Sequence, residues 1–269
     1  MPRHLFALFV FATIASCGTS EVRDGAPAGR AASAGLPDDA IPRPEPRGRY
    51  GNGPVYEVFG KRYTVMDSAS GYKERGVASW YGKKFHGRPT SSREIYDMHA
   101  MTAAHKTLPL PTYVQVRNLR SGKSIIVRVN DRGPFVDNRI IDLSYAAARK
   151  LDMIRDGTSI VEVTAINFDA PEGNRPTRNT RSRAAVAEPA AIHGNKIYIQ
   201  VGAFGSRENA HRSYSMLKTG GIDDALIHKS EAPALYRVRI GPISGVVEFD
   251  RLVKRLAGLG IRNPILVTQ

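Results

Sequence analysis

Apolar side chains are regularly spaced in two parts of the chain, residues 55–168 and 196–269. Before and between these parts, residues 17–54 and 169–195 are rich in Ala, Gly, Pro and charged residues and lack an apolar period. Such segments cannot bury enough apolar surface to offset the entropy lost on ordering. The pattern therefore predicts two folded domains, preceded by a disordered tether and separated by a disordered linker.

The first predicted domain consists mostly of strands in which apolar and polar side chains alternate, with one short Ala-rich helix. The strands are expected at residues 113–118, 125–129 and 160–166, and the helix at residues 145–151. The first two strands flank a turn-like Arg-Ser-Gly-Lys sequence, which predicts a β-hairpin. Asp142 or Ser144 can cap the helix. Short strands with one brief helix favour a small β-barrel.

The second predicted domain alternates between strand and helix periods. Strands are expected at residues 197–203, 225–229, 236–240 and 265–267, and helices at residues 206–218 and 246–257. In the first helix Ala210, Tyr214 and Leu217 share one face. The resulting order βαββαβ is that of a ferredoxin-like α+β domain.

The N-terminal segment has the pattern of an export signal. Residues 1–16 begin with a short basic lead and continue as an apolar run that is too short to span a bilayer as a permanent helix. This run ends at Cys17, after small residues, and resembles the lipobox of bacterial lipoproteins. The resemblance implies acylation of Cys17 and a lipid anchor in a membrane. Gly18, where an aspartate would favour retention in the inner membrane, favours the outer membrane, facing the periplasm.

Charge and cysteine content restrict the partners. The formal net charge of +14 favours an acidic partner, such as nucleic acid, an anionic membrane or a cell-wall polymer. Export argues against nucleic acid, and the strand expected at residues 236–240 lacks the aromatic RNA-binding pattern. A single cysteine excludes a disulfide framework. Since His86, His99 and His105 lack metal-ligand spacing, we expect neither a metal nor another cofactor.

Motifs between residues 76 and 144 carry a resemblance to the rare lipoprotein A family. They read GVASWYG (76–82), FHGR (85–88), EIYDM (94–98), TAAH (102–105), LP (108–109), VRVNDRGPF (127–135) and RIIDLS (139–144). The resemblance implies a double-psi β-barrel, as in expansins. At residues 90–94 the chain reads TSSRE, which keeps the family's acid Glu94 but places Arg93 where the family has glycine.

Two motifs in the second domain resemble the SPOR domain, which binds glycan strands that lack stem peptides. They read YIQVGAF (198–204) and YRVRIGP (236–242). Gln200 and Arg237 have the hydrogen-bonding groups that a sugar or a lactyl carboxylate requires, and Phe204 can supply apolar contact. The alternative for each of these residues is an ordinary solvated sheet face.

The combined resemblance implies an endolytic peptidoglycan lytic transglycosylase. Such a lyase cleaves the bond between N-acetylmuramic acid and N-acetylglucosamine without adding water and leaves 1,6-anhydromuramyl ends. The implied substrate is denuded glycan, and the implied roles are cell division and daughter-cell separation. A non-catalytic septal lipoprotein that binds peptidoglycan or recruits divisome proteins is the alternative.

Cleavage of a glycosidic bond requires a protonated carboxyl group near the leaving oxygen. The resemblance implies that Asp131 is this acid and that Glu94, Asp97 and His105 shape its site. Glu94 and Asp97 are neighbours if their segment is helical. The residues alone leave a second interpretation open, in which Asp131 caps loop amides and His105 is a buried structural histidine.

Substrate contacts in the first domain are expected from Trp80, Tyr81 and Arg132. The aromatic rings can stack on sugar rings, whereas Arg132 follows Asp131 within the same motif. The alternative for both aromatic residues is packing in the core of the domain.

Overall fold

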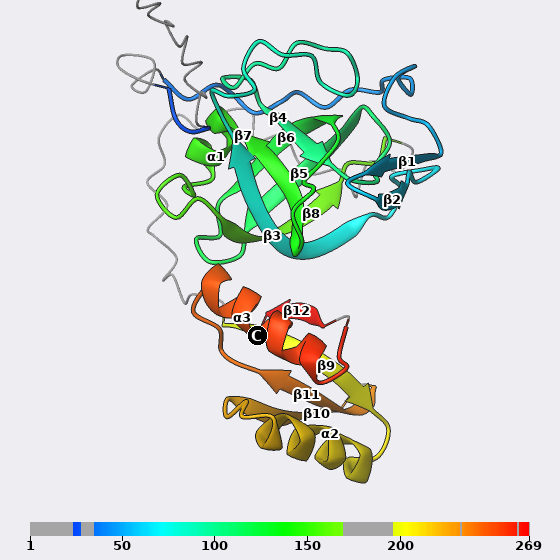
Figure 1. Ribbon diagram of the computed structural model, residues 1–269, viewed down its shortest axis with the longest axis vertical. Helices are drawn as coiled ribbons and strands as arrows, with labels where there is room; N and C mark the ends of the chain where they lie inside the picture. The colour runs from blue at the N-terminus through cyan, green and yellow to red at the C-terminus, as the bar shows by residue number, and fades with distance from the viewer. Residues whose placement is uncertain (1–23, 28–34, 169–195, 232, 263, 269) are drawn as a thin grey trace, which may run out of the picture.

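The computed structural model shows two folded parts (Figure 1). It describes residues 24–27, 35–168, 196–231, 233–262 and 264–268. The expected signal peptide at residues 1–16, Cys17 and the linker at residues 169–195 lie outside the described residues. Within the described ranges, no helix is both long and apolar enough to cross a bilayer.

Six strands of the first domain close a barrel in the order β3-β7-β4-β6-β5-β8 (Figure 1). The strands are β3 (Lys73–Tyr81), β4 (Thr102–His105), β5 (Thr112–Asn118), β6 (Ser124–Asp131), β7 (Arg139–Ser144) and β8 (Ser159–Ala165). β3 pairs with β7, and β4 with β6, in parallel, while the other neighbours are antiparallel. The predicted hairpin, β5–β6, and the final strand, β8, are confirmed.

Every second side chain of the barrel strands points into the interior and fills it. Val114 and Val116 of β5 and Val127 and Val129 of β6 are completely buried in a single apolar cluster. Helix α1 (Tyr145–Lys150) adds three buried alanines to the same cluster. The amide of Ala147 donates to the hydroxyl of Ser144 at 3.1 Å, so Ser144 is the helix cap.

Residues 35–54 lie against the barrel, although the sequence predicted a tether without fixed structure over residues 17–54. The side chain of Asp39 forms an ion pair with Lys150 at 2.8 Å, and the side chain of Asn52 binds both the amide and the carbonyl of Leu110. These contacts are ion pairs and hydrogen bonds to the backbone. Because they require no apolar period, the hydrophobic pattern could not reveal them.

A two-stranded hairpin follows this segment outside the barrel. It consists of β1 (Val55–Val58) and β2 (Lys61–Thr64). The rings of Tyr56 and Tyr63 stack with centroids 5.2 Å apart, and the hydroxyl of Tyr56 donates to the carbonyl of Lys106 at 2.7 Å. The hairpin is therefore held to the loop that follows β4.

The second domain has the predicted order βαββαβ. Its elements are β9 (Ile197–Phe204), α2 (Arg207–Thr219), β10 (Ala225–Glu231), β11 (Ala234–Ile240), α3 (Val246–Gly258) and β12 (Ile265–Thr268). The sheet order is β10-β11-β9-β12. Ile199 and Ile240 of the sheet are completely buried with Leu217 of α2 and Leu256 of α3. Both helices therefore pack on one face of the sheet.

Candidate active site

Two aspartates flank the same residue of the barrel wall. Ala104 of β4 is the register partner of Asp131 in β6 on one side and of Asp142 in β7 on the other. Neighbouring strands lie about 4.8 Å apart, which puts the two aspartate backbones about 10 Å from each other. On the far side of β7, Ser79 of β3 is the partner of Asp142. The four residues form one row across four strands.

A β-bulge sets the direction of Asp131. Val127 and Val129 point into the barrel, so strict alternation would turn Asp131 inward as well. The register between β4 and β6 shifts after Ala103, which pairs with Val129. Ala104 then pairs with Asp131, and Asn130 is skipped. Ala103 belongs to the interior cluster, whereas Ala104 packs outside it with three tyrosines. The bulge therefore turns Asp131 to the outer face, as bulges near functional sites often do.

Asp131 is held by three hydrogen-bond donors. Its Oδ1 accepts from the amide of Ser91 at 2.8 Å, from the hydroxyl of Ser91 at 2.7 Å and from the amide of Arg132 at 2.7 Å. The loop around Ser91 and the end of β6 are thereby tied together at this residue.

Asp142 is mostly buried, and the sequence identified it only as a candidate helix cap. Burial raises its pKa, while the hydrogen bond from Ser79 and the charges of Arg139 and Lys106 lower it less. The hydroxyl of Ser79 donates to Asp142 and itself accepts from the guanidinium of Arg139, at 2.9 Å for the latter. A carboxyl group whose pKa is raised by burial is a candidate for a general acid. Asp142 belongs to the motif at residues 139–144, but the apolar pattern of the sequence cannot distinguish a buried aspartate on the outer face of the barrel from a helix cap.

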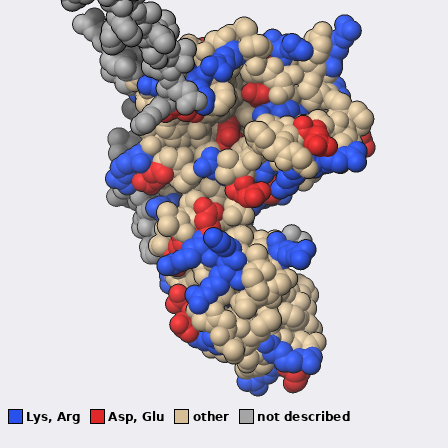
Figure 2. Space-filling model, in the orientation of Figure 1, with Lys and Arg blue, Asp and Glu red and all other residues tan. Residues whose placement is uncertain are grey.

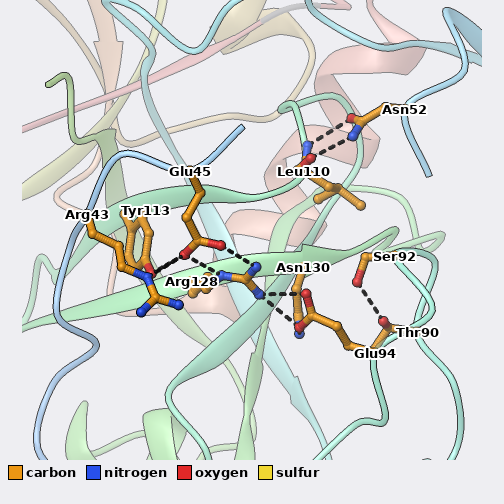
Figure 3. Close-up of polar contacts among 10 residues, drawn as sticks. All are labelled: Arg43, Glu45, Asn52, Thr90, Ser92, Glu94, Leu110, Tyr113, Arg128 and Asn130. Atoms are coloured by element: carbon orange, nitrogen blue, oxygen red, sulfur yellow. Dashed lines mark hydrogen bonds and ion pairs between the residues drawn. The ribbon is translucent and has the colours of Figure 1, made fainter. Parts of the chain in front are cut away.

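Glu94 belongs to an ion-pair network at the end of β6 (Figure 3). Arg128 donates from one nitrogen to both oxygens of Glu94 at 2.8 Å and pairs with Glu45 at 2.8 Å through another. The side-chain amide of Asn130 donates to Glu94 at 2.8 Å. Because Asn130 precedes Asp131, Glu94 fixes the backbone that carries the aspartate. Glu94 and Asp131 are thus brought together through β6.

Glu45 ties the N-terminal segment to this network. Hydrogen bonding to Arg128 lowers the pKa of Glu45 to about 2, with smaller contributions from Tyr113 and Arg43. A depressed pKa stabilises the fold above the ordinary value of 4.5, and this stabilisation is lost as the pH falls from there to about 2.

We expect Glu45→Gln to lower the free energy of unfolding by about 1–2 kcal/mol at pH 7, because its charge is lost and solvent screens part of the pair. Calorimetric melting of both proteins between pH 7 and pH 2 measures this. The difference should shrink as the pH falls through the range 4.5 to 2. A difference that stays constant over that range would show that the charge of Glu45 does not stabilise the segment.

The loop at residues 90–94 accommodates arginine in place of the family's glycine. Arg93 has a φ of 73°, in the left-handed region that favours glycine. The amide of Thr90 donates to the carbonyl of Glu94 at 2.7 Å, and the amide of Arg93 donates to the carbonyl of Thr90 at 2.9 Å. The guanidinium of Arg93 lies 5.5 Å from the ring centre of Tyr50. The tight turn therefore forms with arginine, at a backbone angle that costs about 1–2 kcal/mol in a non-glycine residue.

Arg93→Gly is expected to raise the free energy of unfolding by up to about 1 kcal/mol and to raise the melting temperature accordingly. The reason is that relief of the backbone strain exceeds the extra entropy of glycine in the unfolded chain. Arg88→Gly is the matched control in the preceding turn, where φ is not positive, and should lose about 0.5–1 kcal/mol. Thermal melts compare the two. Equal losses in both variants would contradict strain at Arg93.

Among the described residues Asp97 makes no hydrogen bond to Asp131, although both lie near enough to Tyr96 to raise its pKa. The segment from Glu94 to Met98 is not helical, so the expected neighbour relation between Glu94 and Asp97 does not occur. Asp97 is exposed, accepts from the amide of His99 at 2.9 Å and lies 3.7 Å from the imidazole of His86. Its side chain organises the turn after residue 96.

His105 is a buried, neutral histidine. Burial, reinforced by Arg132 and Lys106, lowers its pKa to about 3. Its Nδ1 accepts from the amides of Thr107 and Leu108, so its proton lies on Nε2, which donates to the hydroxyl of Tyr72 at 2.8 Å. These bonds fix the turn after β4. The geometry matches the structural interpretation that the sequence had left open.

Arg132 is buried and binds backbone carbonyls. Its guanidinium donates to the carbonyls of Gly51 at 2.8 Å, Leu108 at 2.6 Å and His105 at 3.1 Å. It also lies 5.7 Å from the ring centre of Tyr56, and burial lowers its pKa to about 10. The side chain therefore joins the N-terminal segment, the loop after β4 and the end of β6. This use of its donors differs from the expected contact with substrate.

Tyr81 and Trp80 pack within the domain. Tyr81 is buried and stacks on Tyr96 with centroids 4.1 Å apart. Trp80 is half-buried and lies 5.7 Å from the ring of Tyr145. For Tyr81 the geometry fits the core role that was the alternative to sugar stacking. Trp80 retains a partly exposed ring at the end of β3.

The three residues singled out in the second domain lie on two different faces of its sheet. Gln200 pairs with Arg239, next to Arg237, on the face opposite α2 and α3. Phe204 instead packs against the apolar cluster on the helix side. Arg237 is partly exposed and can meet a ligand, whereas Gln200 is buried and Phe204 supports the fold. Lys and Arg side chains also spread over the visible face of both domains (Figure 2), which suits a long anionic polymer.

Comparisons with known proteins agree on both domains. Residues 73–163 match the family described as lytic transglycolase, and residues 194–268 match the SPOR domain. The expected double-psi barrel followed by a SPOR domain is thereby confirmed.

Among curated relatives, the endolytic peptidoglycan transglycosylase RlpA of Pseudomonas aeruginosa is 37% identical over 91% of this chain and 84% of its own length. The protein of the same name from Vibrio cholerae is 55% identical, over 52% of this chain and 52% of its own length. A solved expansin from Clavibacter michiganensis overlaps 50% of this chain and 58% of its own with 15% identity and a TM-score of 0.29, too low for structural conclusions.

Proposed function

The chain belongs to the RlpA family, and from that premise we propose that its barrel is an endolytic peptidoglycan transglycosylase. The observation that supports this most strongly is the pair of outward carboxyl groups on either side of Ala104, one held by three hydrogen-bond donors and one with a raised pKa. Transglycosylation requires one group that delivers a proton and negative charge that stabilises the oxocarbenium-like state. Asp142 and Asp131 meet these requirements.

In the proposed reaction Asp142 protonates the glycosidic oxygen as the bond to C1 of N-acetylmuramic acid breaks. The charge of Asp131, with Oδ1 fixed by Ser91 and Arg132, stabilises the positive charge on the sugar through Oδ2. The 6-hydroxyl of the same sugar then attacks C1, and its proton passes to Asp142. The acid is thereby regenerated, and the product carries a 1,6-anhydro ring without any added water.

Glu94 and His105 act as positioning residues in this proposal. Glu94 holds Asn130 and Arg128, and His105 orders the turn whose carbonyls Arg132 binds. Asp97, on the exposed side of its turn beside His86, keeps the site-shaping role predicted from the sequence. In this proposal two aspartates divide the role that the family resemblance implies for Asp131 alone.

The proposed substrate is glycan that lacks stem peptides, selected by the SPOR domain through the sheet face that carries Arg237, with the buried Gln200 supporting that face. The family and the SPOR domain place the chain in the cell envelope, where peptidoglycan is its substrate. We further propose acylation of Cys17, an outer-membrane anchor that faces the periplasm, and divisome partners at the septum. Cell division and daughter-cell separation are the processes that this location serves.

The experiment that tests the proposal is digestion of amidase-treated sacculi by the purified chain. We expect soluble fragments with 1,6-anhydromuramyl ends from denuded sacculi and few from sacculi that retain their stem peptides. The Asp131→Asn variant should release these fragments at least about 100-fold more slowly than the wild-type chain. Absence of anhydro ends with the wild-type chain would remove the catalytic proposal.

A non-catalytic wall-binding role is the second candidate, and the engagement of Glu94 in ion pairs with Arg128 is the observation that favours it. In that case a strain that lacks the protein is rescued equally by wild type and by Asp131→Asn. Failure of rescue by a folded and abundant Asp131→Asn protein would exclude this candidate.

A further inference from the structure

Three successive backbone amides after β3 bind the chain's own N-terminal segment. The amides of Gly82 and Lys84 donate to Oδ1 of Asp24 at 3.0 and 3.2 Å. The amide of Lys83 between them donates to the carbonyl of Gly25 at 3.0 Å. Consecutive amides that point to one place form a concave anion site. In this chain the site holds a carboxylate that arrives from 58 residues away in sequence.

The surroundings of these amides favour an anion. Lys83 and Lys84 carry two positive charges beside them, and Lys83 is exposed. Gly82 permits the close approach, since a Cβ at this position would lie 2.1 Å from the carbonyl oxygen of Gly25. The site thus combines backbone donors, positive charge and a glycine that leaves room for the bound group.

The amide site follows the same strand that carries Ser79, the partner of Asp142. Gly82 comes three residues after Ser79, the partner of Asp142, so the two positions are about 10 Å apart along β3. The charge of Asp24 adds to burial in raising the pKa of both Asp142 and Tyr96. A carboxylate in the amide site is therefore close enough to act on the proposed general acid.

We propose that the amides of residues 82–84 form a subsite for the lactyl carboxylate of a muramic acid residue without stem peptide, and that Asp24 occupies this subsite until glycan displaces it. This proposal rests on the proposed function. A stem peptide converts the lactyl carboxylate into a neutral amide, which cannot replace the charge of Asp24. The barrel itself thereby distinguishes denuded from intact glycan, in addition to the SPOR domain.

The subsite also links substrate choice to chemistry. A lactyl carboxylate bound at residues 82–84 supplies the same negative charge as Asp24, which helps Asp142 to keep its proton. In an intact strand the lactyl group is a neutral amide and brings no charge to these amides. Denuded glycan should therefore both bind better and react faster than glycan that carries stem peptides.

The test is a titration of the ¹⁵N-labelled full chain with N-acetylmuramic acid, followed through the amide resonances of residues 82–84. The methyl ester of the lactyl group and inorganic phosphate serve as comparison ligands. We expect N-acetylmuramic acid to shift these amides and the ester to leave them unchanged. In Asp24→Asn the affinity should increase about threefold to tenfold, because an intramolecular competitor at millimolar effective concentration is removed.

Gly82→Ala is the second variant, since its Cβ would lie 2.1 Å from the oxygen that now accepts from the amide of Lys83, the carbonyl oxygen of Gly25, and would crowd any oxygen bound there. Gly53→Ala is the matched control with no close neighbour. Gly82→Ala should lose the response to N-acetylmuramic acid, and Gly53→Ala should keep it. Equal shifts with the ester or with phosphate, or no shift in wild type and Asp24→Asn, would overturn the subsite. The titration needs no turnover, so its outcome is independent of the sacculus digestion.

Discussion

Asp142→Asn is expected to lower the rate of glycan cleavage by about 10²–10⁴-fold and at the same time to stabilise the folded chain at neutral pH. The amide cannot deliver a proton, which removes the proposed acid. It can still accept from Ser79 and adds no buried charge, which removes the cost of ionising Asp142 in a buried position. Release of anhydro products and thermal melting measure the two effects on the same protein.

The stability effect has a definite pH dependence. Because burial raises the folded-state pKa of Asp142 above its ordinary value of 3.8, the wild type loses stability as the pH rises from there through the raised pKa. Asp142→Asn does not, so its advantage should grow with pH. Asp137→Asn, which alters an exposed barrel aspartate, should change neither rate nor stability noticeably. An Asp142→Asn protein that is less stable yet fully active would contradict both roles.

Arg132→Met is expected to lower the free energy of unfolding by about 3–5 kcal/mol, the largest loss of stability predicted for this chain. The substitution keeps much of the side-chain volume but leaves the carbonyls of Gly51, His105 and Leu108 without their donor. These carbonyls belong to the N-terminal segment and to the end of β4 with the loop after it, so the loss loosens both from the end of β6, which carries Arg132. Urea denaturation of the purified proteins measures it.

Arg117→Met is the matched control for this prediction. Arg117 lies on β5 and is exposed, so its replacement should change stability by no more than about 0.5 kcal/mol. Arg132→Lys should fall between the two, because an ammonium group cannot reach all three carbonyls at once. If Arg132→Met proved as stable as Arg117→Met, the buried arginine would not hold the three segments together.

The second domain followed closely from its sequence, because its helices and strands each carry an apolar period. Ala210 and Leu217 recur on one face of α2, and both are completely buried. In the first domain the alternation in β5 and β6 predicted the hairpin in the same way. Residues 35–54 could not be predicted from such a pattern, since ion pairs such as Asp39 to Lys150 hold them in place.

The candidate site was only partly predictable for related reasons. Asp131 and Glu94 could be selected by their motifs, but the bulge that turns Asp131 outward depends on the register between β4 and β6. Asp142 was overlooked because an aspartate before a helix reads as a cap, and only the packing reveals its burial. The clamp formed by Arg132 joins residues more than 20 positions apart, which no local spacing indicates.

The position of Asp24 has a consequence for the proposed anchor. It lies seven positions after Cys17, so a docked Asp24 holds the barrel within about 25 Å of a lipid-anchored Cys17 even when the intervening chain is fully extended. Once glycan displaces Asp24, the next described contact is that of the Pro37 carbonyl with Lys150, which allows a reach of about 70 Å. Engagement of denuded glycan would thus extend the range of the proposed enzyme from the membrane.

Digestion of denuded glycan in H₂¹⁸O, with mass-spectrometric identification of the new muramyl ends, tests the transglycosylase mechanism most directly. Intramolecular attack by the 6-hydroxyl predicts ends that are lighter than the hydrolysis product by one water and carry no ¹⁸O. Reducing ends that contain one ¹⁸O atom would show that water is the nucleophile and would contradict the mechanism built on Asp142 and Asp131.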